Sequence, residues 1–347
     1  MRPKTLRTAA ALVDAGLAPA SQIAALERVA ARYAVAITPA IAELINPSEP
    51  DDPIARQFVP DVAELAERAE ELSDPIGDEA HSPVPGIVHR YPDRVLLKLT
   101  HVCATYCRFC FRRETVGQDN AAPLSGAALG AALAYIAEHR EIWEVIFSGG
   151  DPLVLSDRRL RAVAQRLAKI EHVKIIRLHT RVPVVAPERV TPALVRAITA
   201  PGKATYVVLH ANHARELTPA VRAACARFID AGIPMLSQSV LLRGVNDDAE
   251  TLGELMRTFV ACRIKPYYLH HADLARGTAH VRTAIEDGQD LVRQLRGRLS
   301  GLCQPTYVLD IPGGHGKSPI GPSYLARAGA RYRVTDYTGR QHSYPRA

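Results

Sequence analysis

The 347-residue sequence lacks any run of about 18 uncharged apolar residues, so no segment is predicted to span a bilayer. It also lacks a basic run interleaved with aromatic side chains, and its net charge of +7 is modest, so we expect no nucleic-acid partner. Basic residues precede an Ala-rich stretch within residues 1–20, but Asp14 interrupts that stretch. We therefore expect an amphipathic start and a cytoplasmic protein rather than a secretory signal peptide.

Cysteine is scarce and unevenly placed. Cys225, Cys262 and Cys303 are widely scattered and are expected to be buried small hydrophobic residues, without a disulfide framework. The other three follow the pattern C-x3-C-x2-C directly after the apolar run 95–99, and they are Cys103, Cys107 and Cys110. Three thiolates from one loop can hold an iron–sulfur cluster and leave its fourth iron free for a ligand that is not protein.

A structural zinc site is the alternative interpretation of the cysteine triplet. Such a site needs four ligands, usually supplied as two separated pairs, and the sequence has no second pair. His101 could serve as a fourth ligand only at an awkward spacing from the strand end. The pattern therefore favours the iron–sulfur cluster.

The order of predicted elements indicates an α/β fold. Residues 1–88 are predicted to be helical, with one helix capped by Ser21, a turn-rich linker at 46–53 and a further helix at 61–72. From about residue 92, short apolar segments alternate with amphipathic helical ones, which is typical of βαβ units and a parallel sheet. About six repeats follow the first strand, too few for an eight-unit barrel. We therefore expect a curved, partial (β/α)6-type barrel.

The same pattern predicts how the chain is divided and where some of its helices begin. The predicted division is an N-terminal helical region at 1–88, the partial barrel at 89–315 and a C-terminal segment at 316–347. Helices starting at Thr191-Pro192 and Thr218-Pro219 have both a cap and a first-turn proline. A hairpin is expected near Thr338-Gly339.

Unusual motifs follow the predicted strands, where parallel sheets gather their functional groups. After strand 144–147 comes Ser148-Gly149-Gly150-Asp151, whose glycines allow close approach of backbone to a ligand. The segment 312–319 is no P-loop, because Ile311 stands where that motif needs glycine and Pro319 blocks the following helix. A glycine-rich arm that presents Lys317 instead favours attachment of an aldehyde cofactor.

Together these residues resemble the lysine 2,3-aminomutase family of radical S-adenosylmethionine (SAM) enzymes, from about residue 84 to about residue 322. The resemblance implies a [4Fe-4S] cluster on the three cysteines, SAM at its open iron and pyridoxal 5′-phosphate on Lys317. The implied SAM residues are Ser148, Gly149, Gly150 and Asp151. Further implied cofactor contacts are Arg90, Arg94, His210 and Gln238.

The resemblance also places Arg112 at the carboxylate of the substrate, and Asp273 and Asp310 at its distal ammonium. An arginine suits a carboxylate because it can bind both oxygens. Two carboxylates at the same edge of the sheet repel each other unless a cation lies between them. The distal ammonium of L-lysine supplies such a cation, which favours L-lysine as the substrate. A relative that acts on glutamate is expected to have neutral or basic residues there. The implied reaction is an intramolecular amino transfer that interconverts L-lysine and L- or D-β-lysine.

Two alternatives stay open. A shorter bacterial relative, whose β-lysine is attached to elongation factor P, is favoured by the length of the chain. A non-catalytic protein that binds a metal cluster or zinc is the alternative from another class. Only about 30 residues follow Lys317 and none is cysteine, so the C-terminal zinc site of longer members is predicted to be absent. A homo-oligomer and an electron donor of the flavodoxin or ferredoxin type are also expected.

Overall fold

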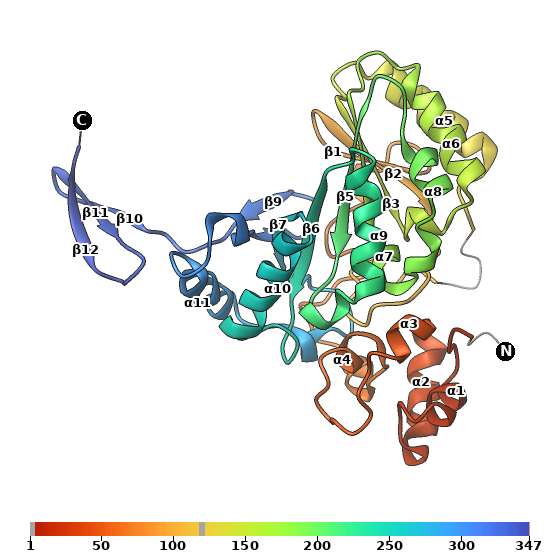
Figure 1. Cartoon of the computed structure of the whole chain (residues 1–347), viewed down its shortest axis with the longest axis horizontal. Helices are drawn as coiled ribbons and strands as arrows, with labels where there is room; N and C mark the ends of the chain where they lie inside the picture. Colours follow the sequence, from red (N-terminus) through yellow and green to blue (C-terminus); the bar gives the residue numbers. More distant parts are fainter. Residues whose placement is uncertain (1–3, 118–121, 347) are drawn as a thin grey trace.

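The computed structural model describes residues 4–117 and 122–346 (Figure 1). Its centre is a curled nine-stranded sheet whose strands lie in chain order, with β2 to β8 parallel and antiparallel strands β1 and β9 at the two edges. These strands are β1 (Ile87–Tyr91), β2 (Arg94–Thr100), β3 (Glu144–Gly149), β4 (Ile175–Thr180), β5 (Ala204–His210), β6 (Met235–Leu241), β7 (Ile264–His271), β8 (Thr306–Asp310) and β9 (Lys317–Pro319). The parallel run of strands confirms the predicted partial barrel.

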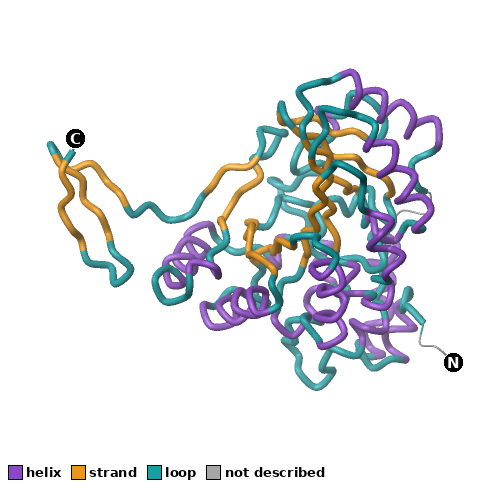
Figure 2. Tube along the Cα trace, turned by 45° about the horizontal axis from the view of Figure 1, so that its top comes forward, coloured by secondary structure: helices purple, strands orange, loops and turns teal. Residues whose placement is uncertain are grey.

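Helices connect the parallel strands and surround the sheet (Figure 2). They are α5 (Gly126–Glu138), α6 (Asp157–Ala168), α7 (Val182–Val185), α8 (Pro192–Ile198), α9 (Pro219–Asp230), α10 (Ala249–Ala261) and α11 (Ile285–Leu295). The predicted caps at Thr191 and Thr218 are confirmed, since each side chain accepts a hydrogen bond from a backbone N–H in the first turn, and Ser125 caps α5 in the same way.

Each strand divides its side chains between two faces. In β4, Ile176 and Leu178 are buried in the hydrophobic core, whereas Arg177 and His179 line a central cavity. Gln238 in β6 also faces this cavity. Because successive side chains of a strand point to opposite faces, one face of the sheet packs on helices and the other is left for a ligand.

The N-terminal region packs against the loop that follows β2. Its helices are α1 (Ala9–Asp14), α2 (Ile23–Arg32), α3 (Pro39–Ala42) and α4 (Ala55–Phe58). Thr105 in the loop donates its hydroxyl to the Ala36 carbonyl at 2.6 Å, and the Arg108 N–H donates to the Gln57 carbonyl at 2.9 Å. The region therefore buttresses the cysteine loop.

Two predictions for the N-terminal region are wrong. Ser21 lies in a 3-10 turn and does not cap α2, which begins at Ile23. The predicted helix at 61–72 is a single 3-10 turn, Val62–Leu65. Later in this segment, the Leu72 N–H donates to the Leu274 carbonyl of the barrel at 2.7 Å instead of to a carbonyl within a helix. The tertiary hydrogen bond therefore overrides helical propensity.

The C-terminal residues form a separate three-stranded antiparallel sheet that projects from the barrel (Figure 1). Its strands are β10 (Leu325–Ala328), β11 (Arg331–Thr335) and β12 (Gln341–Pro345). The β11–β12 pair confirms the hairpin expected near Thr338, whereas β1, β9 and β10 were not predicted. The three-part division of the chain stays a prediction. Within residues 4–117 and 122–346, no helix is both long and apolar enough to cross a membrane.

Candidate active site

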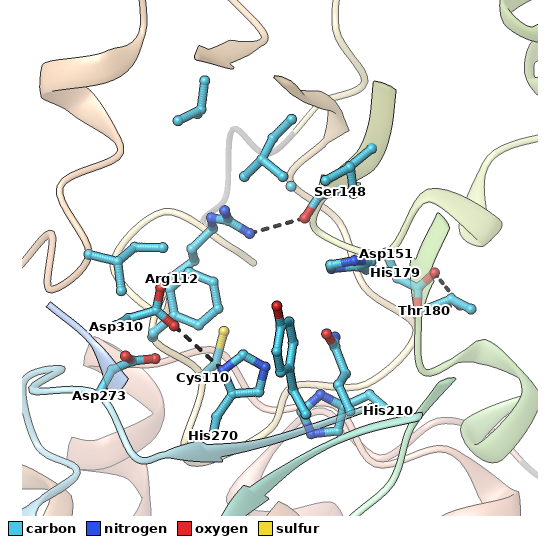
Figure 3. A pocket seen from close by; sticks show the side chains of 18 of the residues that line it. Cys110, Arg112, Ser148, Asp151, His179, Thr180, His210, His270, Asp273 and Asp310 are labelled. Carbon is cyan, nitrogen blue, oxygen red and sulfur yellow. Dashed lines mark hydrogen bonds and ion pairs between the residues drawn. The ribbon is translucent and has the colours of Figure 1, made fainter. Parts of the chain in front are cut away.

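A cavity of about 350 Å³ lies on the inner side of the sheet (Figure 3). Every site residue predicted from the sequence lines it, although their individual roles stay predictions. The set comprises Arg90, Arg94, Cys103, Cys107, Cys110, Arg112, Ser148, Gly149, Gly150, Asp151, His210, Gln238, Asp273, Asp310 and Lys317. Residues up to 227 positions apart in the sequence (90 to 317) thus meet at one site.

The three cysteines in the loop after β2 have raised pKa values, so without a metal ion their thiols keep their protons. Burial raises the pKa of Cys110 to about 11, and the neighbouring Cys107 adds to that shift. Burial likewise raises the pKa of Cys103 and of Cys107. Such thiols become thiolates when a metal replaces their protons, so this donor set fits an iron–sulfur cluster.

The Gly149-Gly150 pair allows the loop after β3 to touch the cysteine loop. The Gly150 N–H donates to the Thr100 carbonyl at 2.6 Å, and the Asp151 N–H donates to the Val102 carbonyl at 3.0 Å. A Cβ on Gly150 would lie 2.3 Å from the Val102 oxygen, and Gly149 has a φ of +109°. Glycine is therefore required at both positions, and the contact brings the two predicted motifs together.

The Asp151 carboxylate ties this motif to the end of β4. It accepts hydrogen bonds from the Thr180 hydroxyl at 2.8 Å and from the Arg181 N–H at 2.7 Å. Burial raises the pKa of Asp151, and these hydrogen bonds offset part of that rise. Protein donors already surround the carboxylate, and the predicted contact between Asp151 and SAM stays a prediction.

Arg112 is oriented by an acid that the sequence analysis did not identify. Its Nε donates to Asp78 at 2.8 Å, and its Nη1 donates to the Ser148 hydroxyl at 3.2 Å. Arg90 also donates to Asp78, at 3.0 Å. Burial opposes ionisation of Asp78, but the charges of Arg112, Lys98 and Arg90 outweigh it and lower its pKa. No local pattern marks Asp78, because its partners follow it by 12 and 34 residues.

Arg94 takes a more open position at the same wall. Its guanidinium lies 3.8 Å from the centre of the Tyr91 ring and donates to Asp93 at 2.6 Å. The Tyr91 hydroxyl accepts a hydrogen bond from the Lys317 N–H at 2.7 Å. This hydrogen bond joins the wall that carries the predicted cofactor contacts Arg90 and Arg94 to the strand that carries Lys317.

Lys317 pairs with Asp310 because the chain reverses between β8 and β9. The turn contains Gly313, Gly314 and Gly316, all with φ near +85°, a region that favours glycine. Antiparallel register then sets Lys317 directly opposite Asp310, and Nζ lies 2.5 and 2.7 Å from its two oxygens. Burial raises the pKa of Asp310, but hydrogen bonds and charge from His270 and Lys317 outweigh it, and the net pKa lies below the usual range.

Asp273 lies in a different environment from Asp310. The residue is half-buried, and its buried Oδ1 has no hydrogen-bond partner among the described residues. Burial, reinforced by the charge of Asp310, raises the pKa of Asp273 to about 7. A cation that binds beside Asp273 would stabilise its ionised form, so this position favours a positively charged ligand group.

The end of β4 supplies two residues that the sequence analysis missed, His179 and Arg181. Both line the cavity, and they follow a predicted strand just as the recognised motifs do, so position alone could have identified them. Burial keeps the pKa of His179 and of His210 well below the usual value, so both imidazoles are neutral. The His210 ring stacks on Phe109 with centroids 5.6 Å apart.

Comparisons with known proteins agree with this geometry. The family model "Radical SAM superfamily" matches residues 97–256, and "Lysine-2,3-aminomutase" matches residues 292–346. The L-lysine 2,3-aminomutase of Clostridium subterminale is 43% identical over 292 residues, covering 84% of this chain and 70% of the relative. A putative L-lysine 2,3-aminomutase of Aquifex aeolicus is 41% identical over 92% of this chain and 86% of its own length. The glutamate 2,3-aminomutase of Clostridioides difficile is 36% identical over 88% of this chain and 72% of its own length.

The expected cofactors follow from these relationships. Radical SAM proteins use a [4Fe-4S] cluster and SAM, and the cysteine loop with its adjoining Gly-Gly motif fits both. Pyridoxal phosphate is typical of the aminomutase relatives. The matched domains and the identity over most of the chain show that this protein is an isomerase of the aminomutase type and a member of the lysine 2,3-aminomutase family.

Proposed function

We propose that the protein moves the 2-amino group of L-lysine to carbon 3, giving β-lysine, with SAM and pyridoxal phosphate as cofactors. One observation carries the choice of lysine. Asp310 accepts a primary ammonium, that of Lys317, with both of its oxygens, and it lies in the same cavity as Asp273. A lysine side chain ends in the same ammonium group.

When bound, the cluster with SAM supplies a carbon radical that abstracts hydrogen, and pyridoxal phosphate supplies an aldehyde that accepts an amino group. Cys103, Cys107 and Cys110 would hold the cluster. Lys317 would hold pyridoxal phosphate. Arg90 and Arg94, which lie on the adjoining wall, would contact its phosphate.

The chain itself binds and orients the substrate in this proposal. Arg112 would receive the lysine carboxylate, since Asp78 and Ser148 already hold its guanidinium in place. Asp273 and Asp310 would receive the distal ammonium. Tyr267 and Tyr268 form part of the wall and would exclude water from the reacting carbons.

Glutamate is the competing substrate, because one relative is named glutamate 2,3-aminomutase. Its distal carboxylate would face Asp273 and Asp310, and like charges at a buried site are strongly unfavourable. The structure therefore favours lysine over glutamate for this chain.

The decisive experiment is an anaerobic assay with reductant, SAM and pyridoxal phosphate. L-lysine and L-glutamate are supplied in parallel, and the products are separated by chiral chromatography. We expect β-lysine, with glutamate unchanged. Conversion of glutamate, or of another amino acid in place of lysine, would refute the substrate assignment.

Two Lys317 variants test attachment of pyridoxal phosphate. Lys317→Ala and Lys317→Arg are both expected to lose the pyridoxal absorbance while keeping the iron content. Lys317→Arg is the matched control, because it keeps a cation for Asp310 but cannot attach the aldehyde. Retained absorbance in either variant would contradict the role of Lys317.

Three further expectations belong to this proposal. A flavodoxin or ferredoxin type of protein would donate the electron, the chain would form a homo-oligomer, and the enzyme would act in the cytoplasm. Reduction of the cluster by purified flavodoxin and the mass of the protein in solution test the first two.

A further inference from the structure

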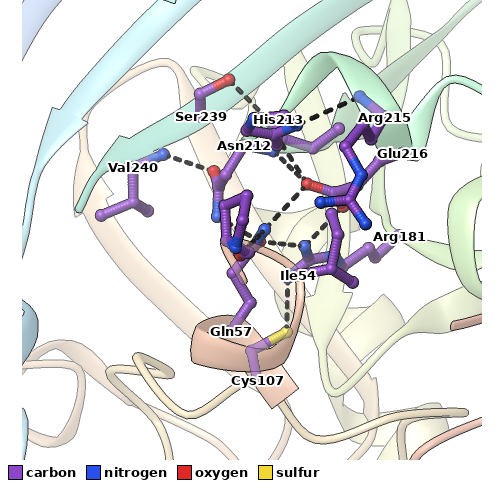
Figure 4. Close-up of polar contacts among 12 residues, drawn as sticks. Ile54, Gln57, Cys107, Arg181, Asn212, His213, Arg215, Glu216, Ser239 and Val240 are labelled. Carbon is purple, nitrogen blue, oxygen red and sulfur yellow. Dashed lines mark hydrogen bonds and ion pairs between the residues drawn. The ribbon is translucent and has the colours of Figure 1, made fainter. Parts of the chain in front are cut away.

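Arg181 contacts the cysteine loop directly, although 74 residues separate it from Cys107. Its Nη1 donates to the Cys107 Sγ at 2.9 Å (Figure 4). Arg181 follows β4 and is buried, with only 6% of its side chain exposed. A charged donor aimed at one predicted cluster ligand calls for an explanation beyond packing.

The remaining guanidinium contacts hold Arg181 in this orientation. Its Nη2 donates to Gln57 and to Glu216, both at 2.6 Å. The Glu216 side chain is fully buried and also accepts the Asn212 N–H at 2.8 Å, so it cannot swing away with the arginine. Buried charges of this kind persist when they are paired and hydrogen-bonded, and here both conditions are met.

Two aromatic rings flank this contact. The guanidinium carbon lies 4.4 Å from the centre of the Phe58 ring and 5.4 Å from that of Phe109. Phe58 is fully buried in the core. In such surroundings a hydrogen bond to charged sulfur is electrostatically stronger than it would be in water.

We propose that Arg181 is a positioning residue that orients Cys107 and raises the reduction potential of the [4Fe-4S] cluster. One-electron reduction places an additional negative charge on the cluster and its thiolates, and no proton needs to move. A fixed N–H donor and its positive charge stabilise that state more than the oxidised one. The electron comes from dithionite, the reductant of the redox titration proposed below, or from the protein donor.

The Arg181 backbone adds a second link. Its N–H donates to Asp151 at 2.7 Å, so the same residue joins the cysteine loop to the motif predicted to bind SAM. Replacing the side chain leaves this backbone bond in place. The effect of the guanidinium on the cluster can therefore be measured separately.

The test is a redox titration that measures the midpoint potential of the cluster. Electron paramagnetic resonance monitors the reduced cluster, and the reconstituted protein contains no lysine or pyridoxal phosphate. Arg181→Gln removes the charge, and Arg181→Lys keeps a charge but cannot reach Cys107, Gln57 and Glu216 together. We expect a more negative potential in both variants, with the larger shift in Arg181→Gln. Iron and sulfide content and circular dichroism are measured for each variant.

Arg177→Gln is the matched control. Arg177 lies on β4, the strand that Arg181 follows, and it lines the same cavity. It pairs with Glu144 at 2.9 Å, and among the described residues no hydrogen bond joins it to a cysteine. Its removal should shift the potential less than Arg181→Gln does.

An unchanged potential in both Arg181 variants would overturn the proposal, as would equal shifts in Arg177→Gln and Arg181→Gln. Loss of the cluster or of the fold in both Arg181 variants would also overturn it, since Arg181 would then be needed for assembly. None of these outcomes depends on the amino acid that the enzyme converts, so the result is independent of the proposed function.

Discussion

Replacing Asp273 by Asn is expected to stabilise the resting protein. The pKa of its half-buried carboxyl is raised from 3.8 to about 7, because desolvation and the charge of Asp310 both disfavour the ionised form. Each pKa unit corresponds to about 1.4 kcal/mol, so the ionised carboxylate destabilises the fold by up to about 4 kcal/mol at alkaline pH. Asn has a similar shape and no charge, and therefore removes this cost.

The sign of the effect follows from proton binding. Between pH 4 and 7 the folded protein keeps a proton on Asp273 that the unfolded chain has released, so this contribution to stability falls as the pH rises. Below about pH 4 both states are protonated, and Asp273→Asn should differ little from the unaltered protein. The stabilisation should therefore grow from pH 5 to pH 7 and level off above it.

Thermal unfolding of the cluster-containing protein, without pyridoxal phosphate or lysine, measures this effect at pH 5, 6, 7 and 8. With about 2–4 °C per kcal/mol for domains of 150–250 residues, the midpoint at pH 8 should rise by several degrees. Asp310→Asn is the matched contrast: it leaves the Lys317 ammonium without its partner and should lower the midpoint throughout this range. An Asp273→Asn protein that is destabilised at pH 8, or equally stabilised at pH 5, would refute the reasoning.

Three other substitutions test the site and its support. Gly150→Ala places a Cβ 2.3 Å from a backbone oxygen of the cysteine loop and should abolish SAM binding in equilibrium dialysis, whereas Gly126→Ala meets no atom within 4 Å and should bind normally. Asp78→Asn weakens the charged hydrogen bond that orients Arg112 and should raise KM for lysine about tenfold in steady-state assays, with a smaller change in kcat. Glu64→Gln leaves two buried arginines without their common carboxylate and should cost about 3–5 kcal/mol in denaturant unfolding.

Local features of the chain were enough to predict the framework. Alternating apolar strands and amphipathic helices identified the parallel sheet, and the threonine caps at 191 and 218 are as predicted. The spacing of Cys103, Cys107 and Cys110 predicts a cluster loop, because all three predicted ligands come from one short segment. Strand ends converge in parallel sheets, so their motifs were expected to meet, and they do.

The helix predicted at 61–72 shows where local reasoning fails. Its sequence is compatible with a helix, but the Glu64 side chain is drawn inward by Arg108 and Arg113 of the cysteine loop. The Leu72 backbone bonds to the barrel at Leu274. Propensity carries no information about such distant partners, and their bonds decide the conformation.

The amino-acid sequence thus determined the class of fold and the predicted cluster loop, because both depend on patterns within short segments. Its resemblance to a known family supplied the other predicted site residues, which line one cavity. Which side chains pair with one another in the site was decided by the tertiary structure. Antiparallel register between β8 and β9 sets Lys317 against Asp310. The curvature of the sheet and the packing of the N-terminal region bring Asp78 to Arg112 and Arg181 to Cys107. Such contacts join residues far apart along the chain, and only the folded packing brings these charges within bonding distance.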